Sequence, residues 1–244
     1  MKWEGICFDL DNTLFSHEQA FKRAIEACYD LYLCKEWSVK SNVSFEYFFS
    51  VFKRNCDKYW GLYENKKLSK EEYRTIRFNE TMKKLHLPCE DGAASMFHSY
   101  YDKSIDNFSE PFPSLFPLLD LLKKLKRNIA VLTNGKSTIQ KNKINHLGVI
   151  PWIQRENIFI SEDIGFAKPQ VEIFKYAEER LNIKAAELLY IGDSWLHDVV
   201  GPMEAGWDSI FLNTRKEERK TNHQPVKEFH TLEEVRLFFA NFDK

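Results

Sequence analysis

Near its start the chain reads WEGICFDLDNTL over residues 3–14. The apolar part of this stretch, which ends at Phe8, is short and partly rich in strand-forming residues, so we predict a β-strand there. Polar residues begin at Asp9 and end the strand abruptly. The carboxylates of Asp9 and Asp11 are therefore expected at the carboxyl end of a strand.

The chain beyond about residue 111 alternates between helical and strand patterns. Short apolar runs, typical of strands covered on both faces, occur at residues 129–132, 158–160, 188–191 and 209–212. Apolar residues at helical spacing lie between them. Strands that alternate with helices usually pair in parallel through right-handed crossovers. We therefore predict an α/β fold with an open parallel sheet and helices on both faces.

The segment between the first strand and this alternating region has a different pattern, with apolar residues at helical spacing almost throughout. Ser69 followed by Glu72 matches a capping box at the start of one of these helices. The simplest organisation is a sheet domain built from both ends of the chain, residues 1–16 and 105–244. An α-helical cap domain, residues 17–104, is inserted between them.

Composition excludes several classes of protein. With 244 residues, of which 43% are hydrophobic, the chain can build a packed interior, which excludes global disorder. A net charge of -1 disfavours nucleic acid and anionic membranes as partners. The five cysteines include no Cys-x-x-Cys pair, and no apolar run has the length of a signal peptide or membrane span. We expect a cytoplasmic protein with reduced thiols, either a monomer or a homodimer.

Polar residues follow several of the predicted strands. Thr133 and Asn134 end the second strand, and Asp193 follows a later one, with Asp198 close behind. Lys168 lies in the loop before a predicted helix. Ligands of open parallel sheets bind beyond the carboxyl ends of the strands, so these side chains should meet Asp9 and Asp11 at one edge.

Crowded carboxylates repel one another, so we expect a divalent cation at this edge of the sheet. Hard oxygen ligands favour Mg²⁺, which commonly binds one or two carboxylates together with substrate phosphate oxygens. We count Asp9, Asp11, Asp193 and Asp198 as candidate metal-site residues. The substrate is then a small phosphorylated metabolite.

A carboxylate held against a metal-bound phosphate can attack phosphorus and form an aspartyl-phosphate. Asp9, directly at the strand end, is the candidate nucleophile, and Asp11 can protonate the leaving alkoxide and later accept a proton from water. The Thr133 hydroxyl can hold phosphoryl oxygens, and Lys168 supplies positive charge beside them. We group Asn134 with Thr133 and Lys168 as substrate-binding residues.

Four segments of the chain resemble, in order and context, the motifs of the haloacid dehalogenase-like (HAD) hydrolase superfamily. They are Asp9-Leu10-Asp11-Asn12-Thr13-Leu14, Thr133-Asn134, Lys168-Pro169, and Gly192-Asp193-Ser194 with Asp198. The resemblance implies a Rossmann-like core, Mg²⁺ dependence and a helical cap of the first cap class. It also implies that Asp9 is the nucleophile, that Asp11 is the acid/base and that Lys168 contacts phosphate. By the same resemblance, Asp193 is a direct metal ligand and Asp198 a supporting carboxylate.

The Asp-x-Asp-Asn-Thr-Leu-Phe start and the loop at residues 165–169 look similar to a nucleotidase-like branch of that superfamily. Substrate preference stays open at this level. Aromatic side chains of the cap could stack on a base or a sugar, although helical spacing also suits core packing; these are Trp37, Tyr59, Trp60 and Tyr63.

We expect a Mg²⁺-dependent phosphomonoesterase, with nucleoside monophosphates and sugar phosphates as the first substrate classes to test. A phosphomutase is the nearest alternative, because the same aspartyl-phosphate can return its phosphoryl group to a sugar. A non-enzymatic phosphate-binding regulatory module is an alternative of a different kind. Dehalogenation fits less well, since a second carboxylate at Asp11 suits alkoxide protonation.

Overall fold

The computed structural model describes residues 1–31 and 43–242. The chain forms two compact units, one made of Met1–His17 and Ser109–Lys244 and the other of Glu18–Phe108. The second boundary lies four residues beyond the one expected from the sequence, because a 3-10 turn, η2 (Ile105–Phe108), continues the last long helix of the insert.

The first unit contains a six-stranded sheet in the order β3-β2-β1-β4-β5-β6, and every neighbouring pair is parallel. This confirms the predicted open parallel sheet. Its strands are β1 (Gly5–Phe8), β2 (Asn128–Thr133), β3 (Ile158–Ile160), β4 (Leu188–Gly192), β5 (Asp208–Leu212) and β6 (Lys227–Phe229). The strand order reverses beside β1, and ligands of such sheets bind at that switch point.

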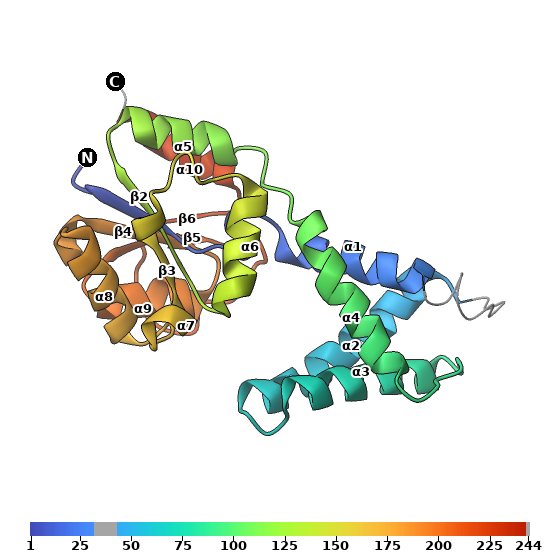
Figure 1. Cartoon of the computed structure of the whole chain (residues 1–244). Coiled ribbons are helices and arrows are strands. Elements are labelled where there is room, and N and C mark those ends of the chain that lie inside the picture. The colour runs from blue at the N-terminus through green and yellow to red at the C-terminus, as the bar shows by residue number, and fades with distance from the viewer. Residues whose placement is uncertain (32–42, 243–244) are drawn as a thin grey trace. The chain divides into compact units, whose positions relative to one another are not determined.

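Helices cover the sheet on two sides, with α8 and α9 on one side and α5 and α10 on the other (Figure 1). The longer helices of this unit are α5 (Leu115–Lys124), α6 (Ser137–Leu147), α8 (Val171–Leu181) and α10 (Leu232–Ala240). The shorter turns are η3 (Arg155–Asn157), α7 (Ser161–Ile164), η4 (Ala185–Glu187), the π-helical η5 (Trp195–Val200) and α9 (Gly201–Glu204).

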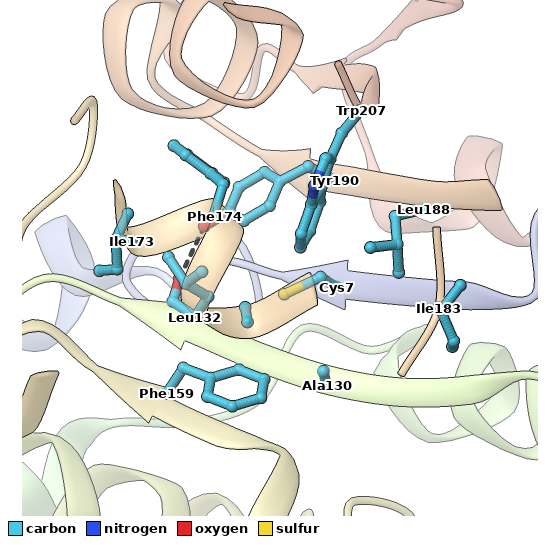
Figure 2. Close-up of a cluster of buried hydrophobic side chains, with 11 residues drawn as sticks. Cys7, Ala130, Leu132, Phe159, Ile173, Phe174, Ile183, Leu188, Tyr190 and Trp207 are labelled. Carbon is cyan, nitrogen blue, oxygen red and sulfur yellow. Dashed lines mark hydrogen bonds between the residues drawn. The ribbon is translucent and has the colours of Figure 1, made fainter. Parts of the chain in front are cut away.

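The core beneath α8 shows why these sequences form strands. Alternate residues of β1, β2 and β4 point to this face, because successive side chains of a strand point to opposite sides. Tyr190 packs against both Phe174 and Trp207, with ring centroids 5.7 and 6.4 Å away, and its hydroxyl donates a hydrogen bond to the Leu132 carbonyl oxygen (2.6 Å; Figure 2). A buried tyrosine with this partner has its one polar group satisfied.

Two elements near the C-terminus were not predicted from the sequence. Strand β6 is a three-residue edge strand, Lys-Glu-Phe, which lacks the apolar run of the central strands. Helix α10 begins with a capping box in which Thr231 and Glu234 satisfy each other's backbone N–H groups. An edge strand needs little apolar character, so its sequence carries a weak signal.

The second unit is helical in its described part. Its helices are α1 (His17–Tyr29), α2 (Phe45–Glu64), α3 (Lys70–Lys84) and α4 (Ala93–Ser104). The predicted capping box of Ser69 and Glu72 is present at the start of α3. Among the described helices of the chain, none has the length and apolar character that a bilayer crossing requires.

The aromatic residues considered for ligand stacking have different surroundings. Trp60 is half exposed and packs edge-on against Tyr63, which stacks on Tyr73 at 5.1 Å. Trp37 lies outside the described residues, as does Cys34. The remaining cysteines, Cys7, Cys28, Cys56 and Cys89, have free thiols.

Candidate active site

The strand register brings the first polar cluster together. Phe8 at the end of β1 pairs with Val131 of β2 on one side and with Ile191 of β4 on the other. The backbone N–H of Asp9 donates to the Ile191 carbonyl oxygen at 2.9 Å, which extends the ladder by one step. Asp9 therefore emerges between the ends of two strands, at the edge where Asp193 also emerges.

Lys168 is the centre of this cluster. Its ammonium nitrogen lies 2.7 Å from Asp9 Oδ1, 2.6 Å from Asp198 Oδ1 and 2.7 Å from the Tyr190 hydroxyl oxygen, and its side chain is 3% exposed. An ammonium group has three hydrogens, so all three are used. Burial opposes the charged form, but Asp198 and Asp9 outweigh it and raise the pKa of Lys168.

Three buried carboxylates lie together here. Asp9, Asp193 and Asp198 each offer an oxygen within 4.8 Å of the others. Burial is the main cause that raises the pKa of Asp9 to about 7, against the opposing charge of Lys168. Burial, with the charges of Asp9 and Asp198, likewise raises the pKa of Asp193 to about 8. Three hard oxygen donors with this much mutual repulsion fit a divalent cation.

The three carboxylates are not equally free to bind a cation. Asp198 accepts from Lys168 through Oδ1 and from the Ser194 backbone N–H through Oδ2 at 2.9 Å, so both of its oxygens have donors. Asp193 Oδ2 lies 2.7 Å from Arg215, whose side chain is 37% exposed. Asp9 accepts from Lys168 through Oδ1, but among the described residues its Oδ2 has only a long contact with the Thr13 hydroxyl, at 3.4 Å. Direct coordination therefore suits Asp9 and Asp193 better, with Asp198 holding the lysine and the loop in place.

Asp11 is not one of the three clustered carboxylates, and its place in a metal site stays a prediction. Its Oδ1 is 2.6 Å from Lys143 Nζ and 3.5 Å from His17 Nδ1, and its Oδ2 accepts from Gln140 at 2.9 Å. Burial alone would raise the pKa of Asp11, but Lys143, His17 and these hydrogen bonds lower it below the ordinary value. The strand ends at Phe8 and the chain turns directly after it, with the Leu14 backbone N–H donating to the Leu10 carbonyl oxygen at 3.0 Å, so the second carboxylate faces α6 instead of the acidic cluster.

Thr133 and Asn134 have different surroundings from each other. Thr133 is buried at the end of β2, and its hydroxyl oxygen lies 2.7 Å from Gln140 Nε2. The Asn134 side chain is used at both ends by the backbone of Lys168: Nδ2 donates to the carbonyl oxygen (2.9 Å), and Oδ1 accepts from the N–H (2.8 Å). Asn134 thus holds the loop that carries Lys168, and its expected contact with the substrate stays a prediction.

Sequence reasoning missed four residues of this site: Tyr190, Gln140, Lys143 and Arg215. Gln140 and Lys143 lie three residues apart on α6, on the buried face that also carries Ile144 and Leu147. Polar residues within an apolar helical stripe are a signal that could have identified them.

The chain thus has a parallel sheet with a buried lysine among acidic residues at its carboxyl edge. The model of the haloacid dehalogenase-like hydrolase family matches residues 3–206, and the chain belongs to that family. The resemblance noted from the motifs is thereby confirmed, as is the assignment of the chain as an enzyme.

Relatives and solved structures agree. The HAD-hydrolase YfnB of Bacillus subtilis is 26% identical over 235 residues, covering 96% of this chain and 94% of its own. Pyrimidine 5'-nucleotidase YjjG of Escherichia coli is 26% identical over 240 residues, covering 96% and 98%. The crystal structure of YfnB bound to magnesium superposes with a TM-score of 0.79 at 23% identity, covering 98% and 99% of the two chains.

Proposed function

We propose that the chain is a Mg²⁺-dependent phosphomonoesterase that hydrolyses a small phosphorylated metabolite through an aspartyl-phosphate on Asp9. The observation that carries this proposal is the position of Asp9. Its carboxylate lies at the strand switch point, 2.7 Å from the Lys168 ammonium and within 4.8 Å of two further buried carboxylates. A nucleophile, a phosphate-binding cation and a metal site then share one location.

The residues divide the reaction between them. Asp9 attacks phosphorus while the P–O bond to the leaving group breaks, and Asp11, which acts in its protonated form in this step, gives the departing alkoxide its proton. Water then attacks the phosphorus of the aspartyl-phosphate and gives a proton to Asp11, which releases inorganic phosphate and regenerates the Asp9 carboxylate. The Thr133 hydroxyl donates to a non-bridging oxygen during both steps, and the positive charge of Lys168 beside these oxygens stabilises them.

Mg²⁺ fits the donor set of Asp9 and Asp193, with Asp198 in support. When bound, it neutralises carboxylate and phosphate charge and polarises a phosphoryl oxygen. Without a metal, the pKa of Asp9 is raised to about 7. A cation beside the carboxylate favours the ionised form that attacks phosphorus, which supports a bound Mg²⁺ here. The magnesium in the YfnB crystal structure gives further support.

Nucleoside monophosphates are the substrate class with the best support. The E. coli relative and PynA of Streptococcus pneumoniae, 25% identical over 96% of this chain, are both named pyrimidine 5'-nucleotidases. Sugar phosphates are the second class: the ribulose-1,5-bisphosphate 5-phosphatase of Halopiger xanaduensis is 26% identical over 89% of this chain, whereas the glyceraldehyde 3-phosphate phosphatase of Methanocaldococcus jannaschii aligns with 41% of it. The similarity to the two nucleotidases covers the helical unit as well as the sheet unit.

The test is phosphate release from uridine monophosphate and from an aryl phosphate, with and without Mg²⁺. We expect release that requires Mg²⁺ and is abolished in Asp9→Asn, a variant of the same shape. Isotope-labelled water should place one labelled oxygen in the released phosphate. A phosphomutase would instead release no phosphate from a sugar phosphate and would form an isomeric sugar phosphate without the label. Equal release by wild type and Asp9→Asn would refute the nucleophile assignment.

A wild-type protein inert toward a broad panel of phosphorylated metabolites, with Mg²⁺ present, would contradict the phosphomonoesterase proposal. In that case, binding of inorganic phosphate without turnover would favour the regulatory-module alternative.

A further inference from the structure

Helix α6 carries two polar side chains on its buried face. Gln140 is 2% exposed and Lys143 is 6% exposed, and they are separated by three positions, so they lie side by side on the helix. Buried lysine and glutamine side chains are uncommon unless their polar atoms have partners. Here the partners are residues to which the proposed reaction gives chemical roles.

The Gln140 amide has a determined orientation. Its nitrogen lies 2.9 Å from Asp11 Oδ2, 2.7 Å from Thr133 Oγ1 and 3.2 Å from the Asn134 carbonyl oxygen. A carbonyl oxygen and an ionised carboxylate can only accept, so the NH₂ end of the amide must face them. Gln140 is therefore the donor in this cluster.

This orientation decides the direction of the Thr133 hydroxyl. Its oxygen accepts a hydrogen from Gln140, so its own hydrogen must point elsewhere. The acceptor within the chain, the Asn134 carbonyl oxygen, is 3.5 Å away, which is long for an O–H···O hydrogen bond. The Thr133 hydrogen is thus available for a phosphoryl oxygen.

Lys143 holds the other side of Asp11. Its ammonium nitrogen lies 2.6 Å from Asp11 Oδ1, opposite the oxygen that Gln140 contacts. With a separate donor on each oxygen, the carboxylate cannot rotate without breaking a charge-assisted hydrogen bond. Each oxygen keeps a second lone pair for the proton that it transfers.

We propose that Gln140 and Lys143 are positioning residues of the phosphoryl-transfer centre. Together they fix the Asp11 carboxylate for proton transfer to the leaving group, and Gln140 also directs the Thr133 hydroxyl hydrogen toward a phosphoryl oxygen. This inference rests on the proposed hydrolysis, because it assigns supports to two of the groups that carry it out.

The leaving group distinguishes positioning from general structural support. Departure of a nucleoside alkoxide requires a proton from Asp11, whereas p-nitrophenolate leaves as a stable anion. The kcat/KM value reports steps up to departure of the leaving group, so it excludes the later attack of water. We expect Lys143→Met to lower kcat/KM for uridine monophosphate by about tenfold or more, and for p-nitrophenyl phosphate by clearly less.

Two further variants at these positions sharpen the test. Lys143→Arg keeps a charged donor. Its ratio of kcat/KM for uridine monophosphate to kcat/KM for p-nitrophenyl phosphate should therefore be closer to the wild-type ratio than that of Lys143→Met. Gln140→Glu keeps the shape but presents acceptors to Asp11 and Thr133, so kcat/KM should fall for both substrates and inhibition by inorganic phosphate should weaken. The Gln140→Glu result stands independently if Lys143→Met does not fold.

Matched controls come from the exposed face of the same helix. Lys141 pairs with Asp163 at 3.0 Å, and Asn142 is exposed, so Lys141→Met and Asn142→Asp should leave both kcat/KM values unchanged. Thermal melting of each variant shows whether it is folded. A wild type that hydrolyses neither substrate would overturn the proposed function and this inference with it. An active wild type with equal losses on both substrates in Lys143→Met, or full activity in Gln140→Glu, would overturn this inference alone.

Discussion

The Lys168 ammonium lies 2.7 Å from the Asp9 carboxylate, although the two residues are 159 positions apart in the chain. The same nitrogen contacts Asp198 at 2.6 Å. One buried cation thus holds the loop after β3 against the ends of β1 and β4. It also offsets part of the charge of the acidic cluster in the absence of metal.

Replacing this lysine should destabilise the protein strongly. In Lys168→Met, Asp9 and Asp198 lose their shared buried cation, and removing one partner of a buried ion pair typically costs about 3–5 kcal/mol. Urea unfolding without metal measures the loss, and Mg²⁺ should restore part of it. The control Lys175→Met, at an exposed position of α8, should change stability by less than about 0.5 kcal/mol. Similar midpoints for the two variants would contradict the structural role of Lys168.

The acidic cluster should make the metal-free protein less stable as pH rises. The folded-state pKa values of Asp9 and Asp193, about 7 and about 8, exceed their ordinary value of 3.8, so the folded state binds more protons than the unfolded state between these limits. Stability then falls with rising pH in this window, by up to about 1.4 kcal/mol per pH unit for each group.

Asp193→Asn tests whether ionisation of this carboxylate lowers the stability of the metal-free protein as pH rises. The amide cannot ionise, so in a chelating buffer the variant should melt higher than wild type at about pH 8, and the gap should narrow toward about pH 5. In Mg²⁺ the order should reverse, because wild type gains from binding a metal that the variant holds poorly. If the metal-free variant melts below wild type at about pH 8, the ionised Asp193 carboxylate does not destabilise the folded protein.

Gly192 should tolerate no side chain. A Cβ at this position would lie 2.5 Å from the Asp198 carboxyl carbon, so Gly192→Ala must displace Asp198 and with it the partner of Lys168. We expect a loss of Mg²⁺-dependent activity by about tenfold or more, since small displacements of catalytic groups are costly. Gly61→Ala is the control: nothing lies within 4 Å of its Cβ position in α2, and stability should rise by about 0.5–1 kcal/mol. Equal activities in the two variants would contradict the prediction.

His98 should give the helical unit the opposite pH dependence. Burial, followed by the charge of Arg77, lowers the pKa of His98 to about 3 from its ordinary 6.5. Between these limits the unfolded state binds the extra proton, so this group lowers stability as pH falls below about 6.5. His98→Leu should remove that contribution, at a cost of about 1 kcal/mol for the lost hydrogen bond to the Arg74 carbonyl oxygen.

The measurement is the difference in unfolding free energy between wild type and His98→Leu at about pH 7 and about pH 5. A difference that shifts in favour of the variant at the lower pH supports the prediction. A constant difference would mean that His98 titrates normally in the folded protein.

Much of the fold was predictable from the sequence because its signals are local. The apolar runs that form β2, β3, β4 and β5 are bounded by polar or glycine residues. A strand of a parallel sheet is buried on both faces, so a short apolar run is enough to identify it. Alternation with helices implied parallel pairing. Strand β6 could not be predicted, because its pairing with β5 depends on backbone hydrogen bonds that its polar sequence does not reveal.

What the sequence determined by itself was the set of chemical groups, Asp9, Thr133, Lys168 and Asp193, and the strand ends that carry most of them. The tertiary structure decided which groups meet. It joined Asp9, Asp193 and Asp198, and it turned Asp11 away toward Gln140 and Lys143. The physical reason is that the strand ends already indicate which edge of the sheet the groups share, whereas the contacts within that edge depend on strand register and helix packing, which no local pattern encodes.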